Sequence, residues 1–315
     1  MHYRQLGKTG LNVSILGFGG SPLSGAFHPV SDAEGIRAVR TALDLGINFI
    51  DTSPLYGRSE EILGKALKGV PPNRYILATK VGQYPGELPD FSADRIVRSV
   101  NESCARLGVD YIDIVQCHDI EFVPLDRILD EALPTLVKLR AAGRIGHVGI
   151  TGLPLRIFPA VIHKADPGMV ETILSFSHYQ LNDSSLESLV PYCREKRVGI
   201  INAAPTGMGL LTDREPPSWH PAPAPIVAGC RRAAAYCREQ GVDIVKLAVQ
   251  FSISHPGLAT TVIGSASAEN IRRNVSYAEA PLDFEHIARV LEILRPIRNH
   301  NFTRGRPENQ DAILA

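Results

Sequence analysis

Four side chains capable of acid–base chemistry lie at or just beyond the ends of apolar segments. Asp51 ends the segment that begins at Asn48, and Tyr56 follows in the polar turn after it. Lys80 ends the segment 75–80, and His118 ends the segment 111–118. Parallel α/β folds collect their chemistry at the carboxyl ends of their strands. We therefore expect these four side chains to meet at one end of the fold, at the mouth formed by the carboxyl ends of the strands.

The residue types suit proton transfer at a carbonyl or an alcohol. A phenol is a poor base at neutral pH because its pKa is about 10, but a neighbouring ammonium favours the phenolate and lowers that value. Lys80 could supply the ammonium for Tyr56, and Asp51 could supply the counter-ion that a buried lysine needs. His118 could donate a hydrogen bond that orients a substrate oxygen.

Each of these residues also has an ordinary structural interpretation. A single Asp–Lys pair or a single histidine at a strand end is more often structural, but four such residues at successive strand ends favour a site. The run from His118 to Glu121 contains metal-ligand residue types, yet strand alternation predicts that Asp119 points away from His118, and no second histidine lies nearby. We expect no metal, and we expect Cys117 to pack in the core rather than act as a nucleophile.

Eight apolar segments alternate with amphipathic ones, which favours a (β/α)8 TIM barrel; a doubly wound sheet is the alternative. The predicted strands begin near residues 15, 49, 75, 111, 147, 172, 198 and 260, and the clearest helices are 31–43, with a capping box, 59–67, 92–107 and 126–141. A β-hairpin formed by 3–6 and 11–14 should plug the bottom of the barrel.

The last third of the chain departs from this regular alternation. Segment 216–223 is too rich in proline for regular structure and predicts an active-site loop. An extra helix is expected at 284–294. The tail 299–315 has little to bury, so we expect it to be mobile unless it folds over the mouth. One domain covering 1–315 is expected.

Composition excludes several classes of protein. The chain has 315 residues, 44% of them hydrophobic, and no net formal charge, so it can bury one large core and shows no basic surplus for nucleic acid. Neither a leader peptide nor an apolar run long enough to cross a bilayer is visible, so we expect a cytoplasmic protein without a membrane partner. Five cysteines without C-x-x-C spacing predict reduced thiols.

Several motifs resemble those of the aldo-keto reductase superfamily, over nearly the whole chain. They are 6–11, 49–57, 78–80 and the strand that ends at His118. More narrowly, the segments 90–93, 117–122, 149–155, 178–183 and 216–221 are similar to those of the plant dehydrogenases that oxidise L-galactose at C1 to a lactone with NAD. The resemblance implies a catalytic tetrad of Asp51, Tyr56, Lys80 and His118, with Tyr56 as the acid–base group.

The same resemblance implies a nicotinamide cofactor across the mouth. Its contacts would be Gly19, Gly20, Thr52 and Ser175, with the pyrophosphate at Gly209, Leu210 and Leu211 and the remaining contacts at Gly264, Ser265, Ser267, Asn270 and Asn274. Members that use NADPH carry Lys and Arg at the positions of Gly264 and Asn270, so we expect NAD. Arg272 and Arg273 are close by, and we interpret them as solvated helix residues. Segment 203–205 lacks the aromatic ring that many members stack on the nicotinamide, so the resemblance does not identify the residue that stacks on it in this chain.

The expected activity is that of an NAD-dependent aldose 1-dehydrogenase acting on L-galactose or a related L-sugar. Candidates for the sugar contacts are Asp119, His178, Tyr179 and Trp219, where Trp219 is either a stacking face or ordinary loop packing. The alternatives are a generic NADPH-dependent aldehyde or ketone reductase, a 1-dehydrogenase of L-fucose or a D-threo-aldose, and a catalytically silent nucleotide-binding regulatory subunit. An intact tetrad favours an enzyme. The sequence does not fix the oligomeric state.

Overall fold

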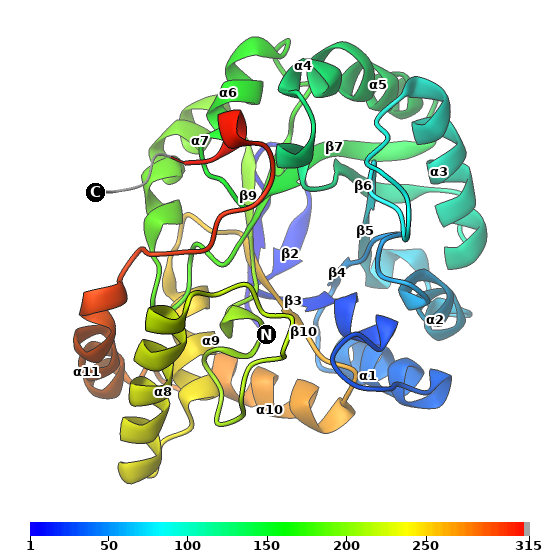
Figure 1. Cartoon of the computed structure of the whole chain (residues 1–315). Helices are drawn as coiled ribbons and strands as arrows, with labels where there is room; N and C mark the ends of the chain where they lie inside the picture. Colours follow the sequence, from blue (N-terminus) through cyan, green and yellow to red (C-terminus); the bar gives the residue numbers. More distant parts are fainter. Residues whose placement is uncertain (312–315) are drawn as a thin grey trace.

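Eight parallel strands form a closed barrel in the computed structural model, which describes residues 1–311 (Figure 1). Strand β10 pairs with β9 on one side and with β3 on the other, so the sheet has no free edge. This confirms the predicted barrel and rules out the doubly wound alternative. The strands are β3 (Leu16–Gly19), β4 (Phe49–Asp51), β5 (Ile76–Val81), β6 (Ile112–Cys117), β7 (Ile145–Gly152), β8 (Thr172–Phe176), β9 (Gly199–Ala203) and β10 (Thr260–Gly264).

Helices surround the barrel (Figure 1). They are α1 (Asp32–Asp44), α2 (Ser59–Leu67), α3 (Ala93–Leu107), α4 (Leu125–Arg127), α5 (Leu133–Ala141), α6 (Ile157–Lys164), α7 (Val190–Lys196), α8 (Ala224–Glu239), α9 (Ile244–Ser254), α10 (Ala268–Glu279) and α11 (Phe284–Leu294). The predicted capping box begins α1: the Glu34 N–H donates to the Ser31 hydroxyl, and the Ser31 N–H donates to the Glu34 carboxylate. The predicted bounds of α2 and α11 are confirmed.

The predicted helix 126–141 is interrupted. A π-helical turn, Ile128–Ala132, separates α4 from α5. Pro134 accounts for the interruption, because proline has no N–H to donate and its ring crowds the carbonyl four residues earlier, which lies in this turn.

The N-terminal hairpin closes the barrel at the end opposite the carboxyl ends of the strands. It consists of β1 (Tyr3–Gln5) and β2 (Asn12–Ser14). Leu6, in the turn, is fully buried and packs in one cluster with Phe49, Ile114 and other side chains of the barrel interior. The Lys8 N–H donates to the Arg197 carbonyl oxygen at 3.1 Å. The predicted plug is confirmed.

Strand alternation divides the core into an inner and an outer layer. On β6, Ile114 belongs to the cluster inside the barrel, whereas Val115 and Cys117 belong to the cluster between barrel and helices. Burial there raises the pKa of the Cys117 thiol well above its ordinary value. Cys117 is therefore a core residue, as expected, and His118 follows it on the inner side.

The segment 299–311, which we call the C-terminal strap, crosses the face of the barrel at the carboxyl ends of the strands (Figure 1, red). The Asn299 N–H donates to the Asn182 carbonyl oxygen at 2.9 Å, and the Asn309 side chain donates to the carbonyl oxygens of Glu121 and Val123. Of the two expectations for the tail, the strap follows the second: it folds over the mouth. Residues 312–315 lie outside the described residues.

Within residues 1–311, no helix combines the length and the apolar character that crossing a bilayer requires.

Candidate active site

The predicted ion pair lies inside the barrel at its mouth. Lys80 Nζ lies 2.5 Å from Asp51 Oδ2 and donates to the Thr52 carbonyl oxygen at 2.8 Å. The Lys80 side chain is 1% exposed, so strand alternation on β5 has carried a charged group into the interior. Burial alone would lower the pKa of Lys80, but Asp51 and Tyr56 raise it above its ordinary value. The lysine is therefore charged at neutral pH.

Tyr56 and His118 complete the predicted group of four. The Tyr56 ring centroid lies 5.0 Å from Lys80 Nζ and 5.5 Å from the centroid of the His118 ring, at an interplanar angle of 87°. A turn after β4, in which the Tyr56 N–H donates to the Ser53 carbonyl oxygen, carries the phenol back over the strand ends. The structure thus brings all four side chains together.

The pKa of Tyr56 is raised to about 12. Burial of the phenol is the largest cause; Lys80 lowers the pKa, whereas Asp51 and Asp119 raise it. The sequence-based expectation of a lowered pKa is therefore wrong for the net effect, although the direction of the Lys80 contribution is as expected. In this site the ammonium limits a desolvation penalty rather than producing a free phenolate.

His118 is neutral at physiological pH because burial lowers its pKa to about 3. Its Nδ1 lies 2.9 Å from Ser53 Oγ, which also accepts the Leu55 N–H. If the Ser53 hydroxyl donates to Nδ1, every one of these groups is satisfied and the ring proton resides on Nε2. This hydrogen-bond pattern makes Nε2 a neutral donor at the mouth. Sequence analysis missed Ser53.

Gln116 is a further residue that sequence analysis missed. Its Nε2 donates to Asp51 Oδ1 at 2.9 Å, so the Asp51 carboxylate is held between an amide and the Lys80 ammonium. The signal was present in the sequence, because alternation that places Ile114 and His118 inside the barrel places Gln116 inside as well.

Asp119 does not point away from His118, so the expectation from strand alternation is wrong. Its backbone adopts the left-handed conformation, with φ of 48°, so strand alternation no longer applies. Asp119 Oδ1 lies 3.8 Å from His118 Nε2 and accepts a hydrogen bond from the Thr151 hydroxyl, which in turn accepts the Asp119 N–H. Burial alone would raise the pKa of Asp119, but the charges of Arg304 and Lys80 and the Thr151 hydrogen bond lower it below its ordinary value.

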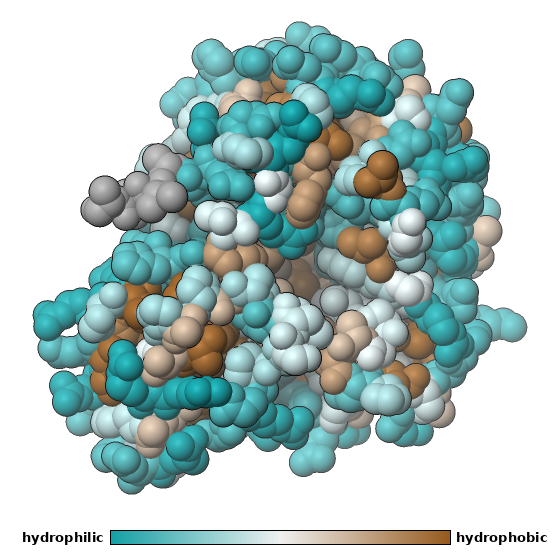
Figure 2. All heavy atoms as spheres, in the orientation of Figure 1, coloured by the Kyte–Doolittle hydropathy of each residue, from teal (hydrophilic) through white to brown (hydrophobic). Residues whose placement is uncertain are grey.

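The C-terminal strap contributes a residue that sequence analysis missed. Arg304 Nη2 donates to Asp119 Oδ2 at 2.7 Å, and Nε lies 3.3 Å from Glu121 Oε1. Burial foremost, followed by Asp119, raises the pKa of Glu121 to about 8. No periodic pattern in the tail could have indicated this contact. Figure 2 shows a hollow near the centre of the face that the strap crosses.

One side of the mouth has little side-chain bulk. Gly19 and Gly264 are paired in register on β3 and β10, and Ala203 ends the neighbouring strand β9. A Cβ atom at Gly19 would lie 2.9 Å from Val262 Cγ1, and one at Gly264 would lie 2.7 Å from Pro22. The opposite side carries Lys80 and His118. Those two positions therefore require glycine, and because glycine and alanine project no long side chain, a flat ring such as a nicotinamide fits against this side and faces the tetrad.

The side chains of two predicted cofactor residues, Thr52 and Ser175, pack in the wall of the barrel. The Thr52 hydroxyl forms a hydrogen bond with Ser59 Oγ at 2.8 Å, and a Cβ atom at Gly20 would lie 2.5 Å from the same oxygen. Ser175 follows Leu174, which faces the interior, so alternation places its side chain on the outer side. The structure does not bring the side chains of Thr52 and Ser175 to the mouth.

The predicted pyrophosphate contacts lie in the turn after β9. The N–H groups of Gly209, Leu210 and Leu211 already donate to carbonyl oxygens of Thr206 and Gly207. An anion could accept from these N–H groups only if the turn opened. The side chains of Leu210 and Leu211 pack against α8 and α9.

The remaining predicted contacts surround the N-terminus of α10, an end that favours anions. The Ser267 hydroxyl caps the helix by accepting the Asn270 N–H, and Ser265 Oγ accepts the Ser267 N–H. Asn274 is buried one turn further on. Arg273 donates to Asn270 Oδ1 at 2.9 Å. A guanidinium therefore lies beside Asn270, one of the two uncharged residues on which the expectation of NAD rather than NADP was based.

The predicted sugar contacts fall into different places. Trp219, 48% exposed, packs edge-on against Phe27 with ring centroids 5.3 Å apart, at the predicted irregular loop. His178 Nδ1 is held by Ser185 and Asp183. Tyr179 stacks on Phe251 of α9 at 5.0 Å, so its ring lies behind the barrel wall and not at the mouth.

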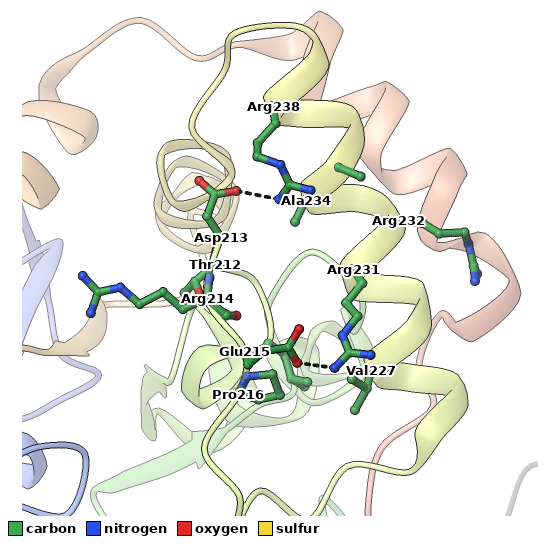
Figure 3. Close-up of a pocket in the computed structure, with 12 residues that line it drawn as sticks. Thr212, Asp213, Arg214, Glu215, Pro216, Val227, Arg231, Arg232, Ala234 and Arg238 are labelled. Atoms are coloured by element: carbon green, nitrogen blue, oxygen red, sulfur yellow. Dashed lines mark hydrogen bonds and ion pairs between the residues drawn. The ribbon is translucent and has the colours of Figure 1, made fainter.

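A second hollow, of about 580 Å³, lies between the segment after β9 and helix α8 (Figure 3). Arg231 pairs with Glu215, and Arg238 pairs with Asp213 at 3.3 Å. The other two arginines shown, Arg214 and Arg232, point away from it on opposite sides. No member of the tetrad lines this hollow, so the mouth is the candidate active site.

The chain is similar to known proteins over nearly its whole length. The model of the Aldo/keto reductase family matches residues 15–295. L-galactose dehydrogenase of Arabidopsis thaliana is 45% identical over 97% of this chain and 98% of its own length, and D-arabinose 1-dehydrogenase of Saccharomyces cerevisiae is 34% identical over 83% and 82%. The solved structure of an aldo-keto reductase of Bacillus halodurans, in its holo form, has a TM-score of 0.80 at 28% identity and covers 99% of this chain and 100% of its own.

The chain belongs to the aldo/keto reductase family, which confirms the resemblance seen in the motifs. Members of this family are oxidoreductases that bind a nicotinamide cofactor.

Proposed function

We propose that this protein is an aldose 1-dehydrogenase that oxidises L-galactose, or a closely related L-sugar, to its aldonolactone with NAD. The observation that carries the proposal is the meeting of the Tyr56 phenol, a charged Lys80 and a neutral His118 at the mouth of a chain 45% identical to a plant L-galactose dehydrogenase. Oxidation at C1 needs a proton acceptor and a donor on the same oxygen, and Tyr56 and His118 supply them.

In the proposed reaction, His118 Nε2–H donates a hydrogen bond to the anomeric hydroxyl oxygen and orients it. Tyr56, as the phenolate, accepts the hydroxyl proton while the C1–H bond breaks and the C1–O double bond of the lactone forms. The nicotinamide, when bound, supplies the hydride acceptor. Lys80 stabilises the phenolate, Asp51 holds Lys80 in place, and Gln116 in turn holds Asp51.

The preference for NAD rests on the residues around the N-terminus of α10. Gly264 carries no charge that could pair with a 2′-phosphate, and Asn270 offers only a neutral amide. Arg273 is the observation that favours the second candidate, an NADP-linked reductase, because its guanidinium is already close to Asn270.

The decisive experiment is a panel of aldoses with NAD and with NADP, followed by the absorbance of the reduced nicotinamide. We expect L-galactose with NAD to give the highest kcat/KM. D-Galactose should be worse by a large factor, because mirror-image hydroxyls leave buried polar groups unpaired, an error that can cost about 10,000-fold. Equal rates on the two enantiomers, or activity on simple aldehydes with NADPH alone, would overturn the proposal. L-Fucose lacks the C6 hydroxyl of L-galactose, and a higher kcat/KM on L-fucose would reassign the substrate.

A further inference from the structure

The C-terminal strap brings to the mouth a cation that the proton transfer does not need. The Arg304 guanidinium donates to Asp119 Oδ2 at 2.7 Å and faces the rings of Phe122 and Phe176, at 4.7 and 5.4 Å. Its side chain is 32% exposed, so the guanidinium contacts the carboxylate without being fully removed from solvent. The two rings and the ion pair fix its direction.

Asp119 places a carboxylate beside the oxygen-binding end of His118. The 3.8 Å between Asp119 Oδ1 and His118 Nε2 is too long for a hydrogen bond, so Nε2–H stays available to a substrate oxygen. Thr151 holds Asp119 at both its N–H and its carboxylate. A molecule whose reacting oxygen lies on His118 therefore presents its next polar atom to Asp119 and Arg304.

The Asp119–Arg304 ion pair can bind a sugar hydroxyl better than a single solvent-exposed charge can. A hydroxyl group donates one hydrogen bond and accepts others, and here a carboxylate acceptor and a guanidinium donor lie side by side. Hydrogen bonds to charged groups are also stronger than those between neutral groups. A substrate without a hydroxyl next to the reacting carbon leaves both charges without that partner.

We propose that Asp119 and Arg304 form the subsite that recognises the hydroxyl on the carbon adjacent to the one oxidised, and that Arg304 is a specificity-determining residue. This inference rests on the proposed function and names the part of the site that selects the sugar. Tyr56, Lys80 and His118 carry out the proton transfer, whereas the Asp119–Arg304 ion pair selects which molecule is oxidised.

The strap around Arg304 is anchored by contacts of its neighbouring residues. The Arg306 N–H donates to the Glu121 carbonyl oxygen at 2.9 Å, and the Asp311 carboxylate accepts the N–H groups of Leu155 and Arg156. Gly305 lies so close to Glu121 that a Cβ atom there would be 2.6 Å from its carbonyl oxygen. These contacts do not involve the Arg304 side chain, so its replacement should leave the strap in place.

The test compares wild type with Arg304→Met on L-galactose and on 2-deoxy-L-galactose, using the cofactor that wild type prefers. Wild type should prefer L-galactose by about 10- to 100-fold in kcat/KM, the value of a hydrogen bond to a charged group. Arg304→Met should lose most of that preference, mainly through a higher KM for L-galactose. Binding of the reduced cofactor, measured by its fluorescence, should not change.

The matched control is Arg306→Met, the same substitution two residues along the strap. Arg306 pairs with Glu308 at the surface, so this variant should retain the wild-type preference. Amide exchange of the Arg306 N–H reports whether the strap stays docked in each variant. The ratio of L-galactose to L-fucose activity should be the same in Arg304→Met and wild type, because the C6 position is remote from the reacting carbon.

Two results would overturn the inference: a preference for L-galactose over its 2-deoxy analogue that survives Arg304→Met, or an equal loss on both sugars, which would make Arg304 a support of the strap alone. A wild-type protein that oxidises no aldose with either cofactor would instead remove the proposed function itself.

Discussion

At the scale of single residues, removing the Tyr56 hydroxyl tests proton transfer alone, because we expect folding and cofactor binding not to depend on it. Tyr56→Phe deletes the hydroxyl and keeps the ring against His118 and Lys80. We expect kcat for sugar oxidation to fall by about 100- to 10,000-fold, the usual value of a general acid–base group. The free energy of unfolding and the affinity for the reduced cofactor should change little.

The matched control for this variant is Tyr192→Phe on α7, which removes a buried tyrosine hydroxyl with no hydrogen-bond partner among residues 1–311. Steady-state kinetics of both variants and denaturant unfolding give the comparison. Near wild-type turnover in Tyr56→Phe would remove Tyr56 from its assigned role.

The raised pKa of Tyr56 predicts a pH dependence with a definite sign. Oxidation needs the phenolate, and because the pKa of about 12 lies above the assay range, each unit of pH increases the phenolate fraction about tenfold. We therefore expect kcat/KM for oxidation to rise from neutral to alkaline pH, while reduction, which needs the protonated phenol, does not rise. An oxidation rate that falls over this range in wild type would contradict the assignment.

The residue scale also shows what periodicity can and cannot predict. Asp51, Lys80 and His118 could be predicted because each occupies an inward position of a regular strand. Asp119 could not, because a single left-handed residue ends the alternation and turns its carboxylate back toward His118. Ser175 was assigned from resemblance, and alternation from Leu174 would have placed it on the outer side.

At the scale of elements, the N-terminus of α10 should determine the choice of cofactor. Asn270→Arg adds a guanidinium in its first turn, where it could pair with a 2′-phosphate. We expect the ratio of kcat/KM for NADP to that for NAD to rise about tenfold or more. Arg273→Gln is the companion variant, which should leave the wild-type ratio unchanged if Arg273 is a solvated residue. A wild type that favours NADP would contradict the interpretation of Gly264 and Asn270.

The strap depends on one glycine. Gly305 has φ of 82° and no room for a Cβ atom, so Gly305→Ala combines left-handed strain, about 1–2 kcal/mol, with a clash against Glu121. We expect the strap to detach, with faster amide exchange over 299–311 and a lower preference for L-galactose over its 2-deoxy analogue. Gly69→Ala is the matched control, because Gly69 has φ of 78° and no atom within 4 Å of the added Cβ. If Gly305→Ala and Gly69→Ala gave the same amide exchange and the same sugar preference, close packing at Gly305 would not be needed to hold the strap in place.

Elements differed in how far the sequence could predict them. The capping box at Ser31 and the bounds of α2 followed from local patterns. Helix 126–141 was predicted as continuous because the apolar spacing continues through it, and Pro134 interrupts it only through its ring and its missing N–H. The strap has no periodic pattern, since single anchors such as Asn309 and Asp311 hold it.

At the scale of the whole molecule, the chemistry of the five cysteines should report on unfolding. All five are buried, and burial raises the pKa of each thiol. Thiolates react and thiols do not, so a thiol reagent should modify the native protein only as fast as it opens. Denatured protein, which should give five equivalents, is the control. Rapid modification of any cysteine in the native protein would contradict this expectation.

The two ends of the described chain lie at opposite ends of the barrel, where one forms a hairpin that plugs it and the other forms a strap that crosses the mouth. The hairpin packs into the core through Leu6, whereas the strap is attached by hydrogen bonds to backbone groups, including those of Glu121 and Leu155. Such attachments do not depend on which side chain occupies position 304. On the proposed role of Arg304, exchanging the strap between relatives, with its anchors kept, would change sugar selectivity without altering the catalytic barrel.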